Sequence, residues 1–136
     1  MIKKGCMLSI IIIFLTIFLT GCQEQTAVDT SSNKVKVDSD LVQLVQGKLN
    51  KIKDGDKVIR VEVEYRFKNI AGRIINIDTT VEFYDKNDEL VATVDGIEIT
   101  PMPANYEEIG TNIASYDGEN VAEIAYAKLI VKEMEF

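Results

Sequence analysis

The 136-residue chain carries 22 acidic residues against 15 lysines and arginines, a formal net charge of −7, and its length suits one domain with a short extension. Such an acidic surface repels nucleic acid and anionic lipid headgroups, which excludes both as ligands of the folded part. Histidine is absent and both cysteines lie within the first 22 residues, so the remainder cannot build a Ser-His or Cys-His nucleophile or an ordinary zinc site.

The first 22 residues have the organisation of a bacterial lipoprotein signal. Two lysines supply a positive start, an apolar stretch extends from 6 to 19, and Leu19-Thr20-Gly21-Cys22 closes it. This tetrapeptide resembles the lipobox, in which a lipid joins the cysteine thiol before the bond between Gly21 and Cys22 is cut. The alternative is an uncleaved single-pass anchor, because the apolar stretch is near the upper limit for a signal core and slightly short for a membrane span.

Cleavage before Cys22 predicts three parts: a signal peptide (1–21), a lipidated cysteine with a flexible tether (22–33) and a folded domain (34–136). Residues 23–33 are small, polar and unpatterned, which is typical of a tether. The two lysines of the signal are lost, so 13 basic residues face 22 acidic ones and the net charge becomes −9. Contact with the membrane is therefore expected through the lipid on Cys22.

Residues 35–52 allow two interpretations. Apolar residues recur there at helical spacing, whereas Gly47 weakens a helix and Asp54-Gly55 is a strong hairpin-turn signal. We expect a first strand that ends near Lys53, while the sequence leaves helix or strand open at 38–50.

Two segments with strict alternation follow, at 58–67 and 75–84. This period of two predicts strands with one buried and one solvated face. The positions expected to face inward are Ile59, Val61, Val63, Tyr65, Phe67, Ile75, Ile77, Thr79, Val81 and Phe83. A turn at 69–73 joins the two strands, which either form a hairpin or lie in opposite sheets around one core.

The remaining chain predicts shorter strands. We expect them at 90–94 and 97–99, separated by a turn at Asp95-Gly96, and again at 109–113. Pro101-Met102-Pro103 interrupts the pattern, because proline cannot donate a backbone hydrogen bond to a neighbouring strand. Residues 121–127 suit a helix through their alanines, but 128–132 favour a closing strand. Short strands with frequent turns predict an all-β antiparallel sandwich.

The stretch from Val61 through Asp85 and on to Leu90 resembles the domains of FxLYD-type and YcfL-like bacterial envelope lipoproteins. Those domains pair a strand ending in an asparagine-containing turn with a strand ending in aromatic-Tyr-Asp, here Phe83-Tyr84-Asp85. The resemblance implies an immunoglobulin-like sandwich of about seven strands. It brings no catalytic residues with it.

Asp85, Asn87 and Glu89 have the spacing that opens a calcium-binding loop. The loop then fails, because Leu90 stands where a glycine is needed and Gly96 where a bidentate glutamate is needed. We interpret the segment as a hairpin turn, and we expect neither a metal site nor another cofactor.

Tyr84 and Tyr106, together with Pro101 and Pro103, are the candidates for contact with a partner. Tyr84 points away from the predicted core, and Tyr106 follows two prolines that stiffen the backbone. The alternative is that these tyrosines only cover the edge of a sheet.

Two classes of function remain. The expected one is a non-catalytic binding or structural module, anchored to the outer face of a bacterial membrane with another envelope protein as partner. The alternative is a carboxylate-based enzyme or solute-binding protein of the envelope.

Overall fold

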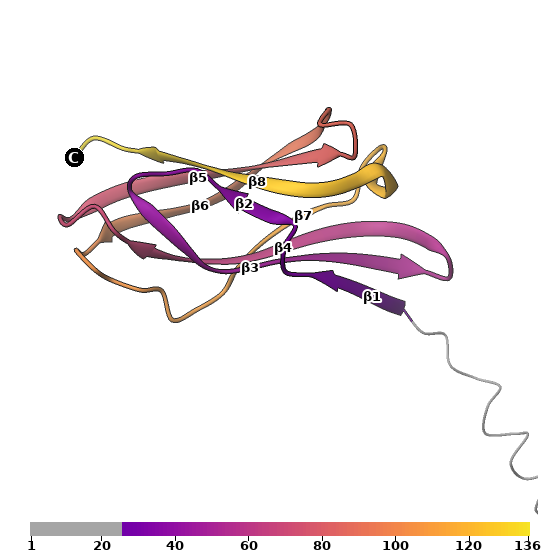
Figure 1. Cartoon of the computed structure of the whole chain (residues 1–136), viewed down its shortest axis with the longest axis horizontal. Coiled ribbons are helices and arrows are strands. Elements are labelled where there is room, and N and C mark those ends of the chain that lie inside the picture. Colours follow the sequence, from indigo (N-terminus) through magenta and orange to yellow (C-terminus); the bar gives the residue numbers. More distant parts are fainter. Residues whose placement is uncertain (1–25) are drawn as a thin grey trace, which may run out of the picture.

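The computed structural model describes residues 26–136. They form eight strands and one short 3-10 helix, with no α-helix among them (Figure 1). The elements are β1 (Thr26–Ser31), β2 (Val35–Val37), β3 (Val42–Asp54), β4 (Lys57–Asn69), β5 (Ile75–Asp85), β6 (Leu90–Met102), β7 (Asn112–Tyr116), η1 (Val121–Glu123) and β8 (Ile124–Glu133).

Two four-stranded sheets face each other, in the orders β1-β3-β4-β7 and β2-β8-β5-β6 (Figure 1). All neighbours are antiparallel except β2 and β8. The all-β sandwich is thus confirmed. The orders β3-β4-β7 and β6-β5-β8 match the A-B-E and C′-C-F orders of an immunoglobulin-like sandwich. Strand β2 occupies the edge of β8 where strand G of such a domain would lie.

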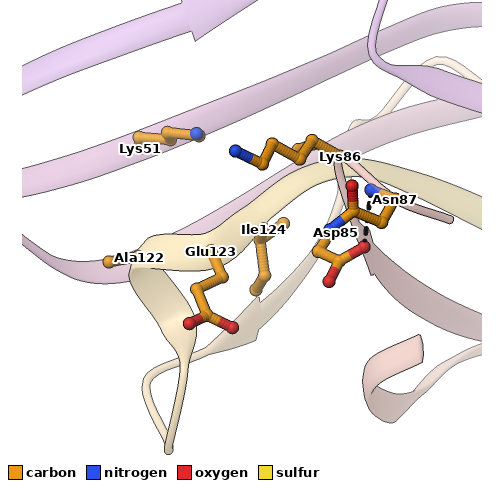
Figure 2. A pocket seen from close by; sticks show the side chains of 8 residues that line it. Lys51, Asp85, Lys86, Asn87, Ala122, Glu123 and Ile124 are labelled. Carbon is orange, nitrogen blue, oxygen red and sulfur yellow. Dashed lines mark hydrogen bonds between the residues drawn. The ribbon is translucent and has the colours of Figure 1, made fainter. Parts of the chain in front are cut away.

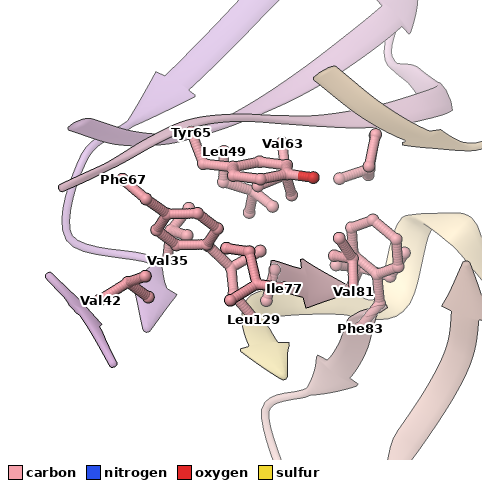
Figure 3. Close-up of a cluster of buried hydrophobic side chains, with 14 of the residues drawn as sticks. Val35, Val42, Leu49, Val63, Tyr65, Phe67, Ile77, Val81, Phe83 and Leu129 are labelled. Atoms are coloured by element: carbon pink, nitrogen blue, oxygen red, sulfur yellow. The ribbon is translucent and has the colours of Figure 1, made fainter. Parts of the chain in front are cut away.

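The core is built by the two alternating strands, β4 and β5. They lie in opposite sheets, and the turn between them carries the chain across the sandwich. Their inward side chains are buried, and Tyr65 and Phe67 of β4 pack with Ile77, Val81 and Phe83 of β5 (Figure 3). The hairpin alternative is therefore wrong, and the arrangement with both apolar faces in one core is confirmed.

Ile59 is the exception among the predicted inward positions. In the β3–β4 pairing Ile52 lies opposite Arg60 and Lys53 opposite Val58, so Ile59 is an extra, unpaired residue. Such a bulge reverses which face the side chains take. Val58 packs against the core in its place, and Ile59 is 40% exposed.

The predicted turn at Asp95-Gly96 is also wrong, because β6 is one continuous strand. Asp78 lies opposite Glu98 and Thr80 opposite Asp95, so Gly96 and Ile97 together face the single residue Thr79. The glycine serves a bulge instead of a turn. The strand continues through Pro101 to Met102, which is buried opposite Ile75. Proline is tolerated there because β6 is an edge strand with another irregularity beside it.

The tether prediction is wrong for Thr26–Ser31. These residues pair with Leu49–Asp54 as strand β1, so the folded part begins eight residues before the predicted boundary at 34. A helix at 38–50 is excluded by β3, whose end at Asp54 agrees with the predicted end near Lys53. Gly47 has a packing role in β3: a Cβ there would lie 2.8 Å from Leu44 and 3.0 Å from Val35 of β2.

Two predictions near the C-terminus need correction. The strand expected at 109–113 is β7, shifted to Asn112–Tyr116, and Ile109 before it is 86% exposed. Residues 121–127 divide between the single turn η1 and the start of β8, so the closing strand is confirmed and the longer helix is not.

Candidate functional site

The two ends of the sandwich differ in what they present. One end, here called the hairpin end, holds the β3–β4 turn at Gly55-Asp56 and the β5–β6 turn at 86–89 (Figure 1). The other, the proline end, holds the β4–β5 turn at 70–74 and the segment 101–111. Strand β1 enters at the hairpin end, because Thr26 lies opposite Asp54. The predicted lipidation site Cys22 and the cleavage site Gly21-Cys22 lie outside the described residues.

A buried asparagine organises the proline end. Asn69 is fully buried at the end of β4, and its amide nitrogen donates to the carbonyl oxygens of Arg73, Met102 and Pro103 at 2.8, 3.0 and 2.9 Å. Its amide oxygen accepts from the N–H of Ala71 at 2.9 Å. One side chain therefore closes the β4–β5 turn and fastens it to the end of β6.

The loop after Pro103 is fixed to the same asparagine and to β4. The N–H of Asn69 donates to the carbonyl of Tyr106 at 2.8 Å, and the N–H of Tyr106 donates to the carbonyl of Pro103 at 3.1 Å. Glu108 exchanges hydrogen bonds with Phe67: its N–H donates to the Phe67 carbonyl, and its carboxylate accepts the Phe67 N–H at 2.7 Å. The loop thus continues the β4 edge beyond the short strand β7.

Three of the four predicted contact residues lie at this end. Pro101 is the second-last residue of strand β6, while Pro103 and Tyr106 are exposed in the loop that follows. The structure adds Ile70 and Ile74 of the β4–β5 turn, which are 46% and 54% exposed, beside Tyr106 at 40%. The proline end therefore combines exposed apolar side chains with a backbone held by internal hydrogen bonds.

The fourth predicted contact residue, Tyr84, lies elsewhere. It is near the hairpin end of β5, nine residues after Ile75, so about 30 Å of strand separates it from the prolines. The ring of Tyr84 stacks on the ring of Tyr126 in β8, with centroids 5.2 Å apart and 11° between the ring planes. The ammonium group of Lys36 lies 4.4 Å from the centroid of the Tyr126 ring. Tyr84 and Tyr106 do not form one surface.

Hydrogen bonds to carboxylates hold both stacked tyrosines. The Tyr84 hydroxyl donates to Glu82, and the Tyr126 hydroxyl donates to Asp88 at 2.9 Å. These hydrogen bonds raise the pKa of both hydroxyls above the ordinary tyrosine value. The stack spans β2, β8 and β5, which is how cross-strand side-chain pairs stabilise a sheet.

The hairpin end holds a hollow of about 470 Å³ (Figure 2). Lys51, Lys86, Asp85 and Glu123 line it, and the two lysine side chains extend toward each other in Figure 2. One Asp85 carboxylate oxygen accepts the N–H groups of Asn87 at 2.8 Å and of Glu89 at 3.0 Å. This bonding agrees with a hairpin turn, and no cluster of three potential metal ligands occurs in residues 26–136.

A tyrosine hydroxyl joins the two sheets inside the core. Tyr65 of β4 accepts the N–H of Ile97 of β6 at 3.2 Å, a group that the bulge at Gly96 turns away from β5. Burial raises the pKa of Tyr65 to about 12.

Sequence reasoning missed Asn69 and the exposed isoleucines Ile70 and Ile74. A signal for Asn69 was present, because it continues the inward positions 61, 63, 65 and 67 as the one polar side chain in that series. The exposure of the isoleucines had no such signal, because an apolar residue in a turn is equally compatible with packing under a loop.

Comparison of the chain with protein-family models, curated proteins and solved structures finds no match. Within 26–136 there is also no helix of the length and apolarity needed to cross a membrane.

Proposed function

We propose that the chain is a bacterial envelope lipoprotein, anchored through lipid on Cys22, whose extracytoplasmic sandwich is a non-catalytic binding or structural module. The observation that carries the proposal is Leu19-Thr20-Gly21-Cys22 behind a positive start and an apolar stretch. A thiol is the acceptor for the lipid, and small residues before it let a peptidase reach the backbone.

The roles of Phe83, Tyr84 and Asp85 support a module without catalysis. Phe83 is fully buried, Tyr84 stacks on Tyr126, and the Asp85 carboxylate accepts two backbone N–H groups of the hairpin turn. The segment that resembles FxLYD-type domains thus serves core, sheet and turn. Such a motif specifies the fold, and the loops at the ends of the sandwich remain to carry the binding.

Lipidation is tested with Cys22→Ser in the full chain, expressed in a bacterium supplied with a labelled fatty acid. The wild type should incorporate label and partition into detergent, since each buried methylene contributes about 0.8 kcal/mol to membrane binding. Cys22→Ser should stay unlabelled and keep its signal. Cys6→Ser is the matched control, because that cysteine lies inside the apolar stretch and should leave labelling intact. A soluble, unlabelled wild type with a free Cys22 thiol would contradict the proposal.

The second candidate is a carboxylate-based enzyme or solute-binding protein, and the hollow at the hairpin end favours it. Glu123 and Asp85 line that hollow beside two lysines. If the purified chain hydrolysed a glycan or an ester and Glu123→Gln removed the activity, this candidate would replace the first.

A further inference from the structure

We propose that four of the exposed apolar side chains at the proline end form the surface by which this protein binds another envelope protein. These residues, the proline-end patch, are Ile70, Ile74, Pro103 and Tyr106. The inference rests on the proposed lipid anchor and adds to it a place, an orientation and a kind of partner.

The backbone of each patch residue lies at Asn69 or next to a group that Asn69 binds. Ile70 follows Asn69 in the chain. Ile74 follows Arg73, whose carbonyl oxygen accepts a hydrogen bond from the Asn69 side chain. Pro103 and Tyr106 present carbonyls that Asn69 binds directly, at 2.9 and 2.8 Å. Two loops far apart in the sequence thus place three half-exposed large apolar side chains and a proline around a single buried residue.

The backbone beneath the patch is already fixed. Asn69 fastens the β4–β5 turn to β6, and the Glu108 carboxylate accepts the Phe67 N–H and two contacts from Asn112 at 3.0 Å. Residues held in this way lose little conformational entropy when a partner binds, which leaves more of the contact free energy for affinity. Exposed apolar side chains on such a surface, with a tyrosine among them, are typical of a protein contact.

The position of the proposed anchor determines which end of the sandwich lies near the bilayer. Cys22 precedes Thr26 by four residues, a span of at most about 14 Å, and Thr26 lies at the hairpin end. The ten residue steps of β5 separate the two ends by about 33 Å. The lipid therefore holds the hairpin end near the bilayer and leaves the proline end outward. The processed chain, with 13 basic and 22 acidic residues after the proposed cleavage, is not attracted to lie flat on anionic lipid.

Charge also decides between a second copy and a different protein. Two lipidated chains of net charge −9 repel each other, whereas a partner with basic groups around an apolar centre is attracted. The occupant expected on the patch is thus a different protein of the same compartment, with an apolar contact face and a basic rim.

The test places a photo-crosslinking amino acid at Tyr106 or Ile74 of the full lipidated chain in living cells. Leu90 is the matched control, because it is 56% exposed, as Ile74 is at 54%, but lies at the hairpin end. The proposal expects one recurrent protein adduct from 74 and 106 and not from 90. Adducts with lipid or with a second copy, adducts from 90 as frequent as those from 106, or no adducts at all would each overturn it.

The partner identified in this way is then purified and titrated with the lipidated protein in detergent. Tyr106→Ala and Ile74→Ser should each weaken binding about tenfold or more, the range of an interface hot spot, and added salt should slow association. Leu90→Ser should leave affinity within about twofold, and circular dichroism should show that all three variants are folded. Equal loss in the Leu90→Ser variant would refute the patch. Fatty-acid labelling of the same samples separates the two proposals, because an unlabelled wild type refutes the anchor, whereas a labelled wild type without patch adducts refutes only the patch.

Discussion

Asn69 shows how much of this fold depends on single polar side chains in the core. A buried amide destabilises a protein by several kcal/mol unless its hydrogen bonds are made, and here both its nitrogen and its oxygen are satisfied by backbone groups. The side-chain nitrogen carries two hydrogens but donates to three carbonyl oxygens, so at least one N–H is shared between two carbonyls. The buried side chain of Asn69 thus joins the β4–β5 turn to the loop that follows β6.

Tyr65 has the corresponding role between the sheets, and Tyr65→Phe isolates it. The ring should keep its place in the core while the Ile97 N–H loses its acceptor, which should lower the free energy of unfolding by about 1–2 kcal/mol. Urea denaturation at neutral pH measures this. Tyr106→Phe is the control, because that side chain is partly exposed, and its stability should match the wild type.

The Tyr65→Phe variant also tests how the stability of the protein depends on alkaline pH. Folding raises the pKa of Tyr65 to about 12 from an ordinary value near 10, so the folded state favours the neutral hydroxyl. Its contribution to stability is fully present below about pH 10 and is lost as the pH rises toward 12. Wild type should therefore lose more stability over that interval than Tyr65→Phe. Parallel curves for the two proteins would show that Tyr65 does not titrate in this way.

At the scale of elements, the strands that alternate between apolar and polar residues were predicted most completely, whereas β1 was missed and β6 was divided by a turn that does not form. In β4 and β5 most pairs of neighbouring residues consist of one apolar and one polar residue, because one face of each strand is buried. This alternation identifies both strands from the sequence. Strand β1 presents no apolar alternation and is defined by pairing with β3. In β6, Asp95-Gly96 is a local turn signal that the sheet overrides, because β5 pairs with the chain on both sides of it. Local pattern contains no information about such distant partners.

The candidate site follows the same division. Pro101, Pro103 and Tyr106 became candidates because prolines and an aromatic residue in a loop are visible in the sequence. The sequence did not show their separation from Tyr84, since that depends on which end of β5 meets which end of β6. The convergence of Ile70 and Ile74 with Tyr106 depends on hydrogen bonds between segments more than 30 residues apart.

The bulge of β6 predicts that substitutions of Gly96 and of Gly110 differ strongly in their effect on stability. A Cβ at Gly96 would lie 2.7 Å from the carbonyl oxygen of Thr79 and 2.7 Å from the Tyr65 hydroxyl, whereas one at Gly110 meets nothing within 4 Å. Gly96→Ala should therefore force the strands apart and cost about 1–3 kcal/mol of stability. Gly110→Ala should be nearly neutral. Thermal unfolding of both variants provides the comparison, and equal midpoints would show that the bulge is not as tight as described.

At the scale of the whole molecule, the N-terminal segment links the sandwich to its proposed anchor. Strand β2 takes the edge position of a G strand, and β1 extends the other sheet, so residues before β3 contribute to both sheets. Strand β1 begins four residues after Cys22, so a lipid at the proposed site would be separated from the domain by only a short length of chain. In the proposed lipoprotein, this short connection would hold the hairpin end toward the bilayer.

Removing β1 tests this arrangement directly. A chain of residues 32–136 should still give a β-type circular dichroism spectrum, because the core strands and β2 remain. It should be less stable than 26–136 by about 1–2 kcal/mol, since the net gain from each backbone hydrogen bond is modest and is partly offset by the entropy of ordering six residues. Amide hydrogen exchange is the more specific measurement. Alternate amides of Leu49–Asp54, which face β1, should exchange faster in the shorter chain, while those of β5 should keep their protection. If exchange across Leu49–Asp54 were the same in both chains, β1 would not pair with β3 in solution, and the flexible tether predicted from the sequence for 22–33 would stand.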